Sequence, residues 1–259
     1  MILGFRRCCF LASFLLLASS VGAYAQSVAA IPDEQVKERL SYVENALQSA
    51  QPRARTWWYG WIAGYSAGAV VQLSLAGAHW NDVKLDKGTP VPRRVRDRAF
   101  AQDMLVGGVT CALGAGNLLI TPFSPAYAAS KLRPMLEGTP EERRAKLEKA
   151  EELLRQCARR EREGRGWKTH ALNLGANAAA GLVTSLAFHR RWTDGLVTFA
   201  TNETVSLLNI FTQPRRAIRD LNNYEVTYLG KQGDYVQERP ARQWLFSVYP
   251  GGFSLGLRF

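Results

Sequence analysis

The chain has 259 residues, of which 47% are hydrophobic and 21% charged, so its composition is that of a folded protein and excludes disorder as the main state. Its formal net charge of +11 is compatible with an anionic membrane surface, an acidic protein or nucleic acid as a partner, and does not choose among them. The sequence has no catalytic signature, nucleotide-binding loop or metal-ligand spacing. We therefore expect a non-enzymatic protein without a cofactor or metal.

Residues 1–25 have the pattern of a signal peptide. Arg6 and Arg7 precede an apolar run, and the segment ends in Ala23-Tyr24-Ala25, the small-residue pattern at which signal peptidase cleaves. We expect export to the cell envelope and a mature chain that begins at Gln26. The alternative is an uncleaved N-terminal membrane anchor.

Export limits the partners and the chemistry of the remaining cysteines. Nucleic acid is disfavoured as a partner, because it is not met outside the cytoplasm and because the basic residues alternate with acidic ones. An oxidising compartment permits a disulfide between Cys111 and Cys157 but does not imply one. Both lie in apolar helical patterns, which favours packing as small hydrophobic residues.

After the signal peptide, one order of features occurs twice along the chain. Each copy has a Pro-acidic start, a charged segment with a narrow apolar stripe, tryptophan, a Gly- and Ala-rich apolar run, and a second apolar run followed by proline. Matched positions include Glu44 and Glu151, Ser74-Leu75-Ala76 and Ser185-Leu186-Ala187, Trp80 and Trp192, and Pro125 and Pro214. We interpret this as a duplicated three-helix unit, residues 26–136 and 137–221. The alternative is chance similarity between Ala-rich helices.

The first helix of each unit is predicted to be charged and amphipathic. In the second unit Thr139 is the expected N-cap, Pro140 the first helical residue and Glu142 the partner in a capping box. The charged faces are expected to be solvated or to pair with another helix. The apolar stripes are Val36, Leu40, Val43 and Leu47 in the first unit, and Leu147, Ala150, Leu154 and Cys157 in the second.

Four segments are apolar and nearly long enough to cross a bilayer: residues 57–78, 104–129, 171–188 and 195–213. Tryptophans stand at both ends of two of them, as in the aromatic belts of membrane proteins. Glycines at every fourth position, Gly60, Gly64 and Gly68, and also Gly107 and Gly114, would permit close helix packing. The runs are also diluted by Ala, Ser, Thr and Asn, so a soluble periplasmic helical bundle that binds a ligand remains the alternative.

The distribution of basic residues conflicts with a cleaved signal. Cleavage would place the segment from Lys131 to Lys168, the most basic in the chain, outside the cytoplasm, whereas the positive-inside rule places it inside. Either the apolar helices do not span a membrane or the signal is retained as an anchor.

Polar residues follow helical spacing in the apolar runs, and one of them is acidic. Glu203 is central in its run, and a carboxylate inside a membrane is costly and is usually kept for pairing or transport. We expect a membrane-embedded chain to supply hydrogen-bond donors to it. The candidate binding residues are Glu203, Asn202, His170, Asn173 and Asn177.

The tail, residues 222–259, has the composition of β-strands. Strands are predicted at 224–228, 244–249 and 253–259, with Pro250-Gly251-Gly252 as a turn, and we expect a short C-terminal β-hairpin packed on the helices. The last strand, alternating and ending at Phe259, resembles the final strand of outer-membrane barrels, but the other strands of a barrel are missing from the sequence.

Together these patterns predict a mainly α-helical bundle in the cell envelope. The function expected is that of a membrane-embedded or membrane-associated scaffold or partner subunit, with membrane lipid, an envelope protein or both as partners; an oligomer is compatible with this. A soluble periplasmic binding module is the first alternative. A membrane enzyme or transporter component that uses Glu203 is the second.

Overall fold

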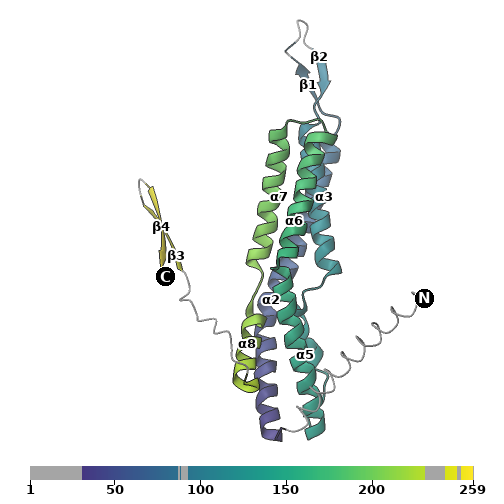
Figure 1. Ribbon diagram of the computed structural model, residues 1–259. Helices are drawn as coiled ribbons and strands as arrows, with labels where there is room; N and C mark the ends of the chain where they lie inside the picture. The colour runs from purple at the N-terminus through teal and green to yellow at the C-terminus, as the bar shows by residue number, and fades with distance from the viewer. Residues whose placement is uncertain (1–30, 87, 89–92, 231–242, 250–251, 259) are drawn as a thin grey trace, which may run out of the picture.

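The computed structural model describes residues 31–86, 88, 93–230, 243–249 and 252–258, so the predicted signal peptide and the residues at its cleavage site lie outside the described residues. The fold is a mainly α-helical bundle (Figure 1). Six of the described helices have 14 residues or more: α2 (Asp33–His79), α3 (Ala99–Ile120), α5 (Pro140–Gly164), α6 (Trp167–Leu182), α7 (Trp192–Thr212) and α8 (Arg216–Leu229). Shorter helical elements are the 3₁₀ helix η1 (Ser124–Ala126), α4 (Ala128–Leu132) and the π-helical turn η2 (Val183–Ala187).

Helix α2 runs the whole length of the bundle and joins two halves of different composition (Figure 1). We call residues 33–56, 121–166 and 213–230 the charged half; it contains the start of α2 with α4, α5 and α8. We call residues 57–79, 99–120, 167–188 and 192–212 the apolar half; it contains the end of α2 with α3, α6, η2 and α7. The charged and apolar segments of the first predicted unit are thus one continuous helix.

Continuity of α2 is maintained through Pro52, which cannot donate a backbone hydrogen bond. The residues on either side of it are held from outside the helix. The Gln51 side chain donates to the Ala126 carbonyl oxygen (3.2 Å), and Arg55 Nε donates to the same oxygen (2.8 Å). These bonds fix η1 against α2 at the level of the proline.

The core of the charged half is formed by the two predicted apolar stripes. All eight residues of the stripes are buried, which confirms the prediction, and they pack with residues of α4 and α8 such as Leu132, Ala217 and Leu221. Cys111 and Cys157 are not joined by a disulfide. Burial raises the pKa of the Cys157 thiol to about 12, so this side chain packs as a small neutral residue.

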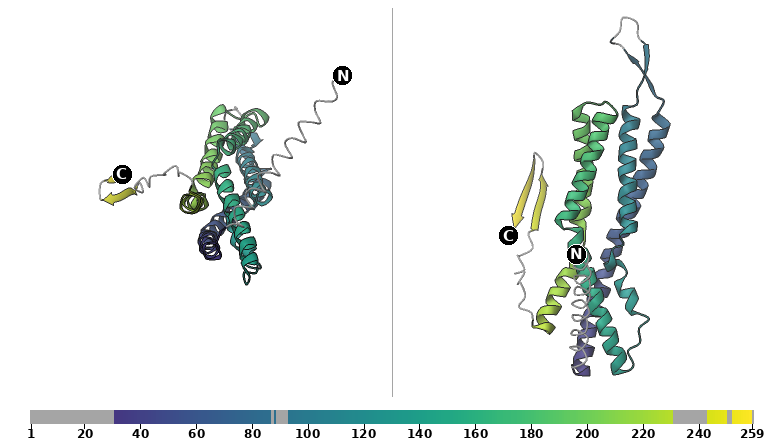
Figure 2. Two further views of the ribbon diagram at one scale, coloured as in Figure 1. Left: turned by 60° about the horizontal axis from the view of Figure 1, so that its bottom comes forward. Right: turned by 45° about the vertical axis from the view of Figure 1, so that its right-hand side comes forward.

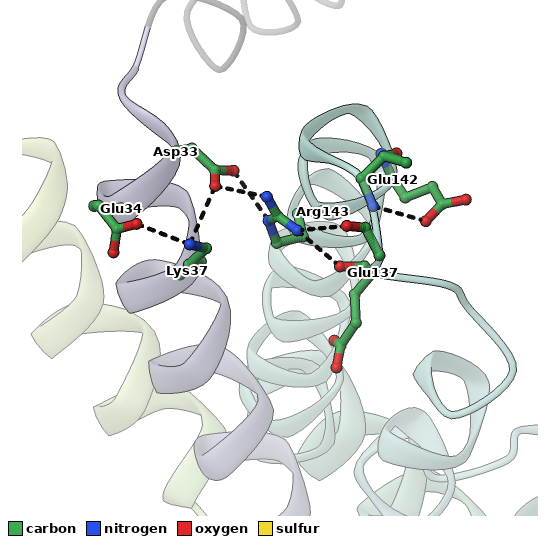
Figure 3. A network of polar contacts seen from close by, with 8 residues as sticks. Asp33, Glu34, Lys37, Glu137, Glu142 and Arg143 are labelled. Atoms are coloured by element: carbon green, nitrogen blue, oxygen red, sulfur yellow. Dashed lines mark hydrogen bonds and ion pairs between the residues drawn. The ribbon is translucent and has the colours of Figure 1, made fainter.

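The start of α5 confirms the predicted capping box. Thr139 Oγ1 accepts from the Glu142 backbone N–H (3.2 Å), and Glu142 Oε2 accepts from the Thr139 backbone N–H (3.1 Å), with Pro140 in the first turn. Next to it, Arg143 contacts both carboxylate oxygens of Asp33 (3.0 and 2.6 Å) and the carbonyl oxygen of Glu137 (3.0 Å) (Figure 3). This fork ties the start of α2 to the start of α5 at the far end of the charged half.

The apolar half consists of two helical hairpins, α2–α3 and α6–α7, lying side by side (Figure 2). Three of the four predicted apolar runs agree closely with helical segments of the structure, but the run 104–129 does not. Helix α3 begins at Ala99 and ends at Ile120, because Pro122 lacks a backbone N–H and disfavours the helical conformation for Thr121 before it. At the outer end, Arg190 joins the hairpins: it donates to the Ala99 carbonyl oxygen (3.0 Å) and contacts Asp103 (3.3 Å).

The glycines divide into two groups. A Cβ at Gly68 would lie 3.1 Å from Cys111 Sγ, and one at Gly114 would lie 3.1 Å from the Tyr65 ring, so these positions do permit close packing of α2 on α3. Gly60 and Gly64, by contrast, have no atom within 4 Å of such a Cβ, so the expectation that they serve helix packing is wrong. The face of α2 that carries these glycines therefore does not contact α3 at Gly60 and Gly64.

Strands occur in two places. Between α2 and α3, β1 (Val83–Asp86) and β2 (Arg93–Arg96) form an antiparallel hairpin at the outer end of the apolar half, which the sequence did not predict (Figure 1). The hairpin joined to the helical bundle is therefore this one and not the expected C-terminal one. Near the C-terminus, β3 (Gln243–Tyr249) and β4 (Gly252–Arg258) pair antiparallel with each other, set apart from the helices (Figure 2). Phe259 and the predicted turn at 250–251 lie outside the described residues.

The strand predicted at 224–228 is wrong, because α8 extends to Leu229. Ala217, Leu221 and Tyr224 recur at helical spacing and are all buried in the charged half, and this packing overrides the strand preference of the Tyr, Val and Thr residues. Gly230 then ends the helix in the left-handed conformation (φ 60°).

Candidate functional site

The central acidic residue of the apolar half has a hydrogen-bond partner on the neighbouring helix. The Asn177 side chain of α6, which is buried, donates to Glu203 Oε2 of α7 (2.8 Å) and to Ser206 Oγ (3.0 Å). The structure thus brings together two of the five residues that the sequence singled out. One turn before Asn177, Asn173 is half-buried on the same helix.

Further polar groups line the same pair of helices. Thr184 Oγ1 of η2, which follows α6, lies 3.3 Å from Thr198 Oγ1 of α7 and adds a second polar contact between these segments. The side-chain nitrogens of Asn202 and Asn209 are shielded from solvent, and neither has a hydrogen-bond partner among the described residues. Asn202 is thus next to Glu203 in the chain, but its side-chain nitrogen takes no part in the contact between Asn177 and Glu203.

His170 lies elsewhere, at the border between the two halves. It lines a cavity of about 520 Å³ together with Arg165, Ile210, Phe211 and Arg215. The imidazole and the Phe211 ring are 6.3 Å apart between centroids. The sequence had grouped His170 with Asn173 and Asn177 on one face, but it is near the start of α6, where that face meets the charged half.

Two arginines reach this cavity from separate elements. Arg165 follows the end of α5, and its Nη2 donates to the Phe211 carbonyl oxygen (2.9 Å), with the guanidinium 6.0 Å from the Phe211 ring. Arg215 lies in the turn between α7 and α8. Burial lowers the pKa of Arg165, and the positive charge of Arg215 lowers it further. Sequence reasoning missed this pair because Arg165 belongs to a dense charge run of the kind that usually faces solvent.

A buried polar cluster stabilises the charged half. Arg39 of α2 donates to Glu151 of α5 (2.5 Å) and to the Tyr224 hydroxyl of α8 (2.7 Å), and the Tyr224 hydroxyl donates to the same Glu151 oxygen. Arg155 approaches the second oxygen of Glu151 (3.1 Å). Burial raises the pKa of Tyr224, and the neighbouring carboxylate raises it further, so the phenol remains a donor. The cluster joins three helices, and we assign it a role in stabilising the fold.

Glu161 is a second buried acidic residue of α5. Its Oε2 accepts from the Ile218 backbone N–H (3.0 Å) at the start of α8, where the helix dipole favours a negative charge. Oε1 has no hydrogen-bond partner within the described part of the chain. Burial nevertheless dominates and raises the pKa of this carboxyl to about 7.

At the other end of the apolar half, a shallow cavity of about 570 Å³ lies beside the β1–β2 hairpin. Its two carboxylates already have basic neighbours: Asp82 contacts His79 (2.7 Å) and Asp97 contacts Lys84 (3.2 Å). In the described ranges, no group of three or more His, Cys, Asp or Glu side chains is placed to hold a metal ion. The cavity between Arg165 and Arg215 is therefore the better candidate for a bound molecule.

Comparison with protein-family models, with curated proteins and with solved structures gave no match to this chain.

Proposed function

We propose that the chain is a non-enzymatic, membrane-embedded protein of the bacterial-type cell envelope, whose apolar half lies in the bilayer and whose charged half projects from it. One observation carries this proposal. Of the large hydrophobic side chains that are exposed in the described structure, all but four lie in the apolar half. A soluble protein seldom gathers so many exposed large hydrophobic side chains in one half of its structure.

The ends of the apolar half support the same placement. Trp57, Trp58, Trp61 and Trp167 lie at the border with the charged half, and Trp80 and Trp192 at the outer end. Tryptophan is enriched at these two levels in membrane proteins because its ring is apolar and its N–H is polar. Residues 57–79 would span about 35 Å as a helix, slightly more than the hydrocarbon thickness.

The charges in the apolar half also fit this environment. Asp103 and Asp194 contact Arg190 at the outer end, and Lys168 is at the border. Glu203 is the remaining charged residue among the described positions of this half, and it accepts from Asn177. An intramembrane polar residue that faces a partner inside the bundle is the arrangement expected in lipid.

The charged half supports a role as a scaffold or partner subunit. Acidic and basic side chains alternate over α2, α5 and α8, and many of them pair across helices, such as Arg143 with Asp33 and Lys146 with Glu44. A rigid surface of both signs suits a protein partner of the envelope. On this proposal the partners are membrane lipid and an envelope protein.

We also propose that the chain arose by duplication of a helical unit. The second unit has a charged helix (α5), two apolar helices (α6 and α7) and a shorter helix (α8). The first unit has the same order, but its charged helix and its first apolar helix are joined as α2, which is followed by α3 and α4. Two ion pairs support the correspondence: Arg39 of α2 pairs with Glu151 of α5, and Lys146 of α5 pairs with Glu44 of α2. Each basic residue lies five positions before the glutamate of its own helix, so the two contacts are reciprocal.

The soluble binding module remains the alternative. Hydropathy favours it, because α3 is the one described helix that is long and apolar enough by itself to cross a membrane. Of the apolar stretch in α3, 22% is buried. The transporter alternative rests on the contact between Asn177 and Glu203. Membrane insertion decides between the first two readings.

The test is aqueous maleimide labelling of single cysteines in a background where the native cysteines are replaced by alanine. Leu182 is exposed in the apolar half, and Leu136 is exposed in the charged half. In membranes, Leu182→Cys should resist labelling, while the control Leu136→Cys should label once the membrane is permeabilised. Equal labelling of both variants, together with release of the protein by alkaline carbonate, would favour the soluble bundle.

Cell localisation and the N-terminus are tested separately. N-terminal sequencing of the purified protein should begin at Gln26, and recovery of Met1 would show a retained anchor. Labelling of Leu136→Cys from the outside of intact spheroplasts would place the charged half outside the cytoplasm. Labelling only after permeabilisation would place it inside.

A further inference from the structure

We propose that the cavity between Arg165 and Arg215 binds the phosphate of one anionic glycerophospholipid. The inference rests on the membrane placement proposed above and names a ligand for that border. It goes beyond general lipid contact, because it assigns one site with a defined chemistry.

The cavity is positively charged. Arg165 and Arg215 come from the end of α5 and from the turn before α8, 50 positions apart, and approach closely enough for the charge of one to disfavour the charge of the other. Within the described ranges neither arginine forms an ion pair with a carboxylate. The nearby carboxyl of Glu161 is directed to the Ile218 backbone N–H instead. The charge of Glu161 acts on Arg165 less strongly than that of Arg215 does, so the two arginines keep a net positive charge that favours an anion between them.

The shape of the guanidinium group suits a phosphate. Guanidinium groups present several N–H donors in a plane and match the oxygens of a phosphate. One donor of Arg165 is used by the Phe211 carbonyl oxygen, and this bond orients the rest of the group. Arg215 is exposed, so its side chain can adapt to the ligand. His170 lines the same cavity and offers a further ring nitrogen.

The cavity is amphipathic, with its charged and apolar residues in the order that a phospholipid requires. Its remaining walls are Ile210 and Phe211 from the last turn of α7, and Phe211 is exposed. A phospholipid has its phosphate at the level of the interface and its acyl chains on the side of the hydrocarbon. The arginines and the apolar walls are arranged in that order along the bundle axis.

In the proposed membrane, the cavity lies at the level of the aromatic residues of the border. Trp167, two positions after Arg165, is 75% exposed and lies at the level of an aromatic belt. Trp57 and Trp61 donate to Thr212 Oγ1 next to the cavity (3.2 and 3.1 Å). The cavity is thus at headgroup level, where basic pockets between helices bind anionic lipids.

The equivalent place in the first unit does not offer this site. Arg55, at the same border, donates to the Ala126 carbonyl oxygen (2.8 Å) and to Ser130 Oγ (3.2 Å), so its donors are directed into the protein. We therefore expect one specific lipid per chain.

The experiment uses the full-length protein in a neutral detergent, titrated with phosphatidylglycerol or with phosphatidylcholine, and counts bound lipid by native mass spectrometry. We expect one saturable phosphatidylglycerol. The double variant Arg165→Gln with Arg215→Gln should weaken binding on the order of tenfold or more, since each basic residue near an anionic lipid contributes substantially. The control pair Arg159→Gln with Arg219→Gln removes the same charge from exposed positions on α5 and α8 and should bind like the wild type.

Several results would overturn the site. Equal weakening by both pairs would show a general effect of net charge, and equal binding of the two lipids would remove the role of the headgroup. Displacement of the lipid by millimolar inorganic phosphate would identify free phosphate as the ligand. Should the double variant misfold, Arg215→Gln alone serves, because that exposed side chain has no contact in the described structure on which folding depends, and an unchanged affinity would then contradict the proposal.

Vesicle flotation separates this inference from the proposed function. The site and the membrane placement are both supported if wild type and double variant insert into pure phosphatidylcholine vesicles and the variant alone loses phosphatidylglycerol binding. Insertion without selective binding refutes the site alone. Failure of the wild type to insert refutes the membrane placement and the lipid site with it.

Discussion

Arg39 of α2 and Glu151 of α5 are 112 positions apart in the sequence and 2.5 Å apart in the charged half, with both side chains almost completely buried. Removing two charges from water is expensive, and the Tyr224 hydroxyl and Arg155 supply the additional hydrogen bonds that such a pair needs. The pair fixes which faces of α2, α5 and α8 meet.

The first prediction concerns this pair. Arg39→Met should lower the free energy of unfolding by about 3–5 kcal/mol, because it removes the buried arginine that pairs with the buried Glu151 carboxylate and leaves only the Tyr224 hydroxyl and Arg155 as its partners. Adding Glu151→Leu should restore part of the loss. The control Lys149→Met, in the exposed pair with Glu152, should cost less than about 1 kcal/mol. Thermal unfolding followed by circular dichroism measures all three, and equal losses for Arg39→Met and Lys149→Met would contradict the prediction.

The second prediction is a pH dependence due to Glu161. Its pKa is raised to about 7 in the folded chain, above its ordinary value, so between these values the folded state holds a proton that the unfolded state has lost. The contribution of this carboxyl to stability is therefore present at low pH and is lost as pH rises through about 7. The loss should be on the order of 3 kcal/mol.

Glu161→Gln tests this, because glutamine resembles the protonated carboxyl and keeps an acceptor for the Ile218 N–H. The variant should match the wild type near pH 5 and exceed it in stability near pH 8. The control Glu163→Gln, at an exposed position on the same helix, should follow the wild type at both pH values. A constant difference between wild type and Glu161→Gln across this range would show that the carboxyl does not titrate there.

The third prediction concerns the crossing of α6 and α7. A Cβ at Gly195 would lie 2.6 Å from the Gly181 carbonyl oxygen, so Gly195→Ala should push the helices apart and cost about 1–3 kcal/mol. Gly64→Ala meets no atom within 4 Å and should leave stability unchanged or raise it by up to about 1 kcal/mol, through helix propensity. Midpoints of thermal unfolding compare them. A stable Gly195→Ala variant would show that the helices are farther apart than described.

The fourth prediction addresses Glu203. Glu203→Gln keeps an acceptor for the Asn177 amide and should fold like the wild type, whereas Glu203→Leu removes it and should cost about 1–2 kcal/mol. Thr204→Leu, at the exposed neighbouring position, is the control. Loss of a cellular phenotype in Glu203→Gln with retained folding would assign a role to the charge. If both Glu203 variants fold and function normally, the residue is not a site.

The features that could be predicted from the sequence are local ones. The capping box at Thr139 and the two buried stripes depend on residues within one or two turns of each other, so their spacing is sufficient evidence. The continuity of α2 could not be predicted in this way, because its two parts carry different hydrophobic patterns and resemble two helices. Similarly, residues 224–228 have strand propensity, and only packing against Tyr42 and the core shows that they are helical.

The candidate sites were predicted less well, for a related reason. The polar residues at helical spacing in two adjacent apolar runs gave Asn177 and Glu203 as candidates, and the structure brings them into contact. Arg165 and Arg215 carry no local signal, because their proximity results from the turn between α7 and α8. Convergence of side chains from distant segments is set by tertiary packing, which one sequence does not display.

The uninterrupted course of α2 also sets a length. Its first 24 residues, 33–56, extend about 35 Å at 1.5 Å per residue. On the proposed placement, the Asp33–Arg143 end therefore stands at a fixed height of that size above the bilayer surface, held by one rod of backbone and not by a linker. A protein that docks at this end would be kept at a constant distance from the membrane, as by a spacer.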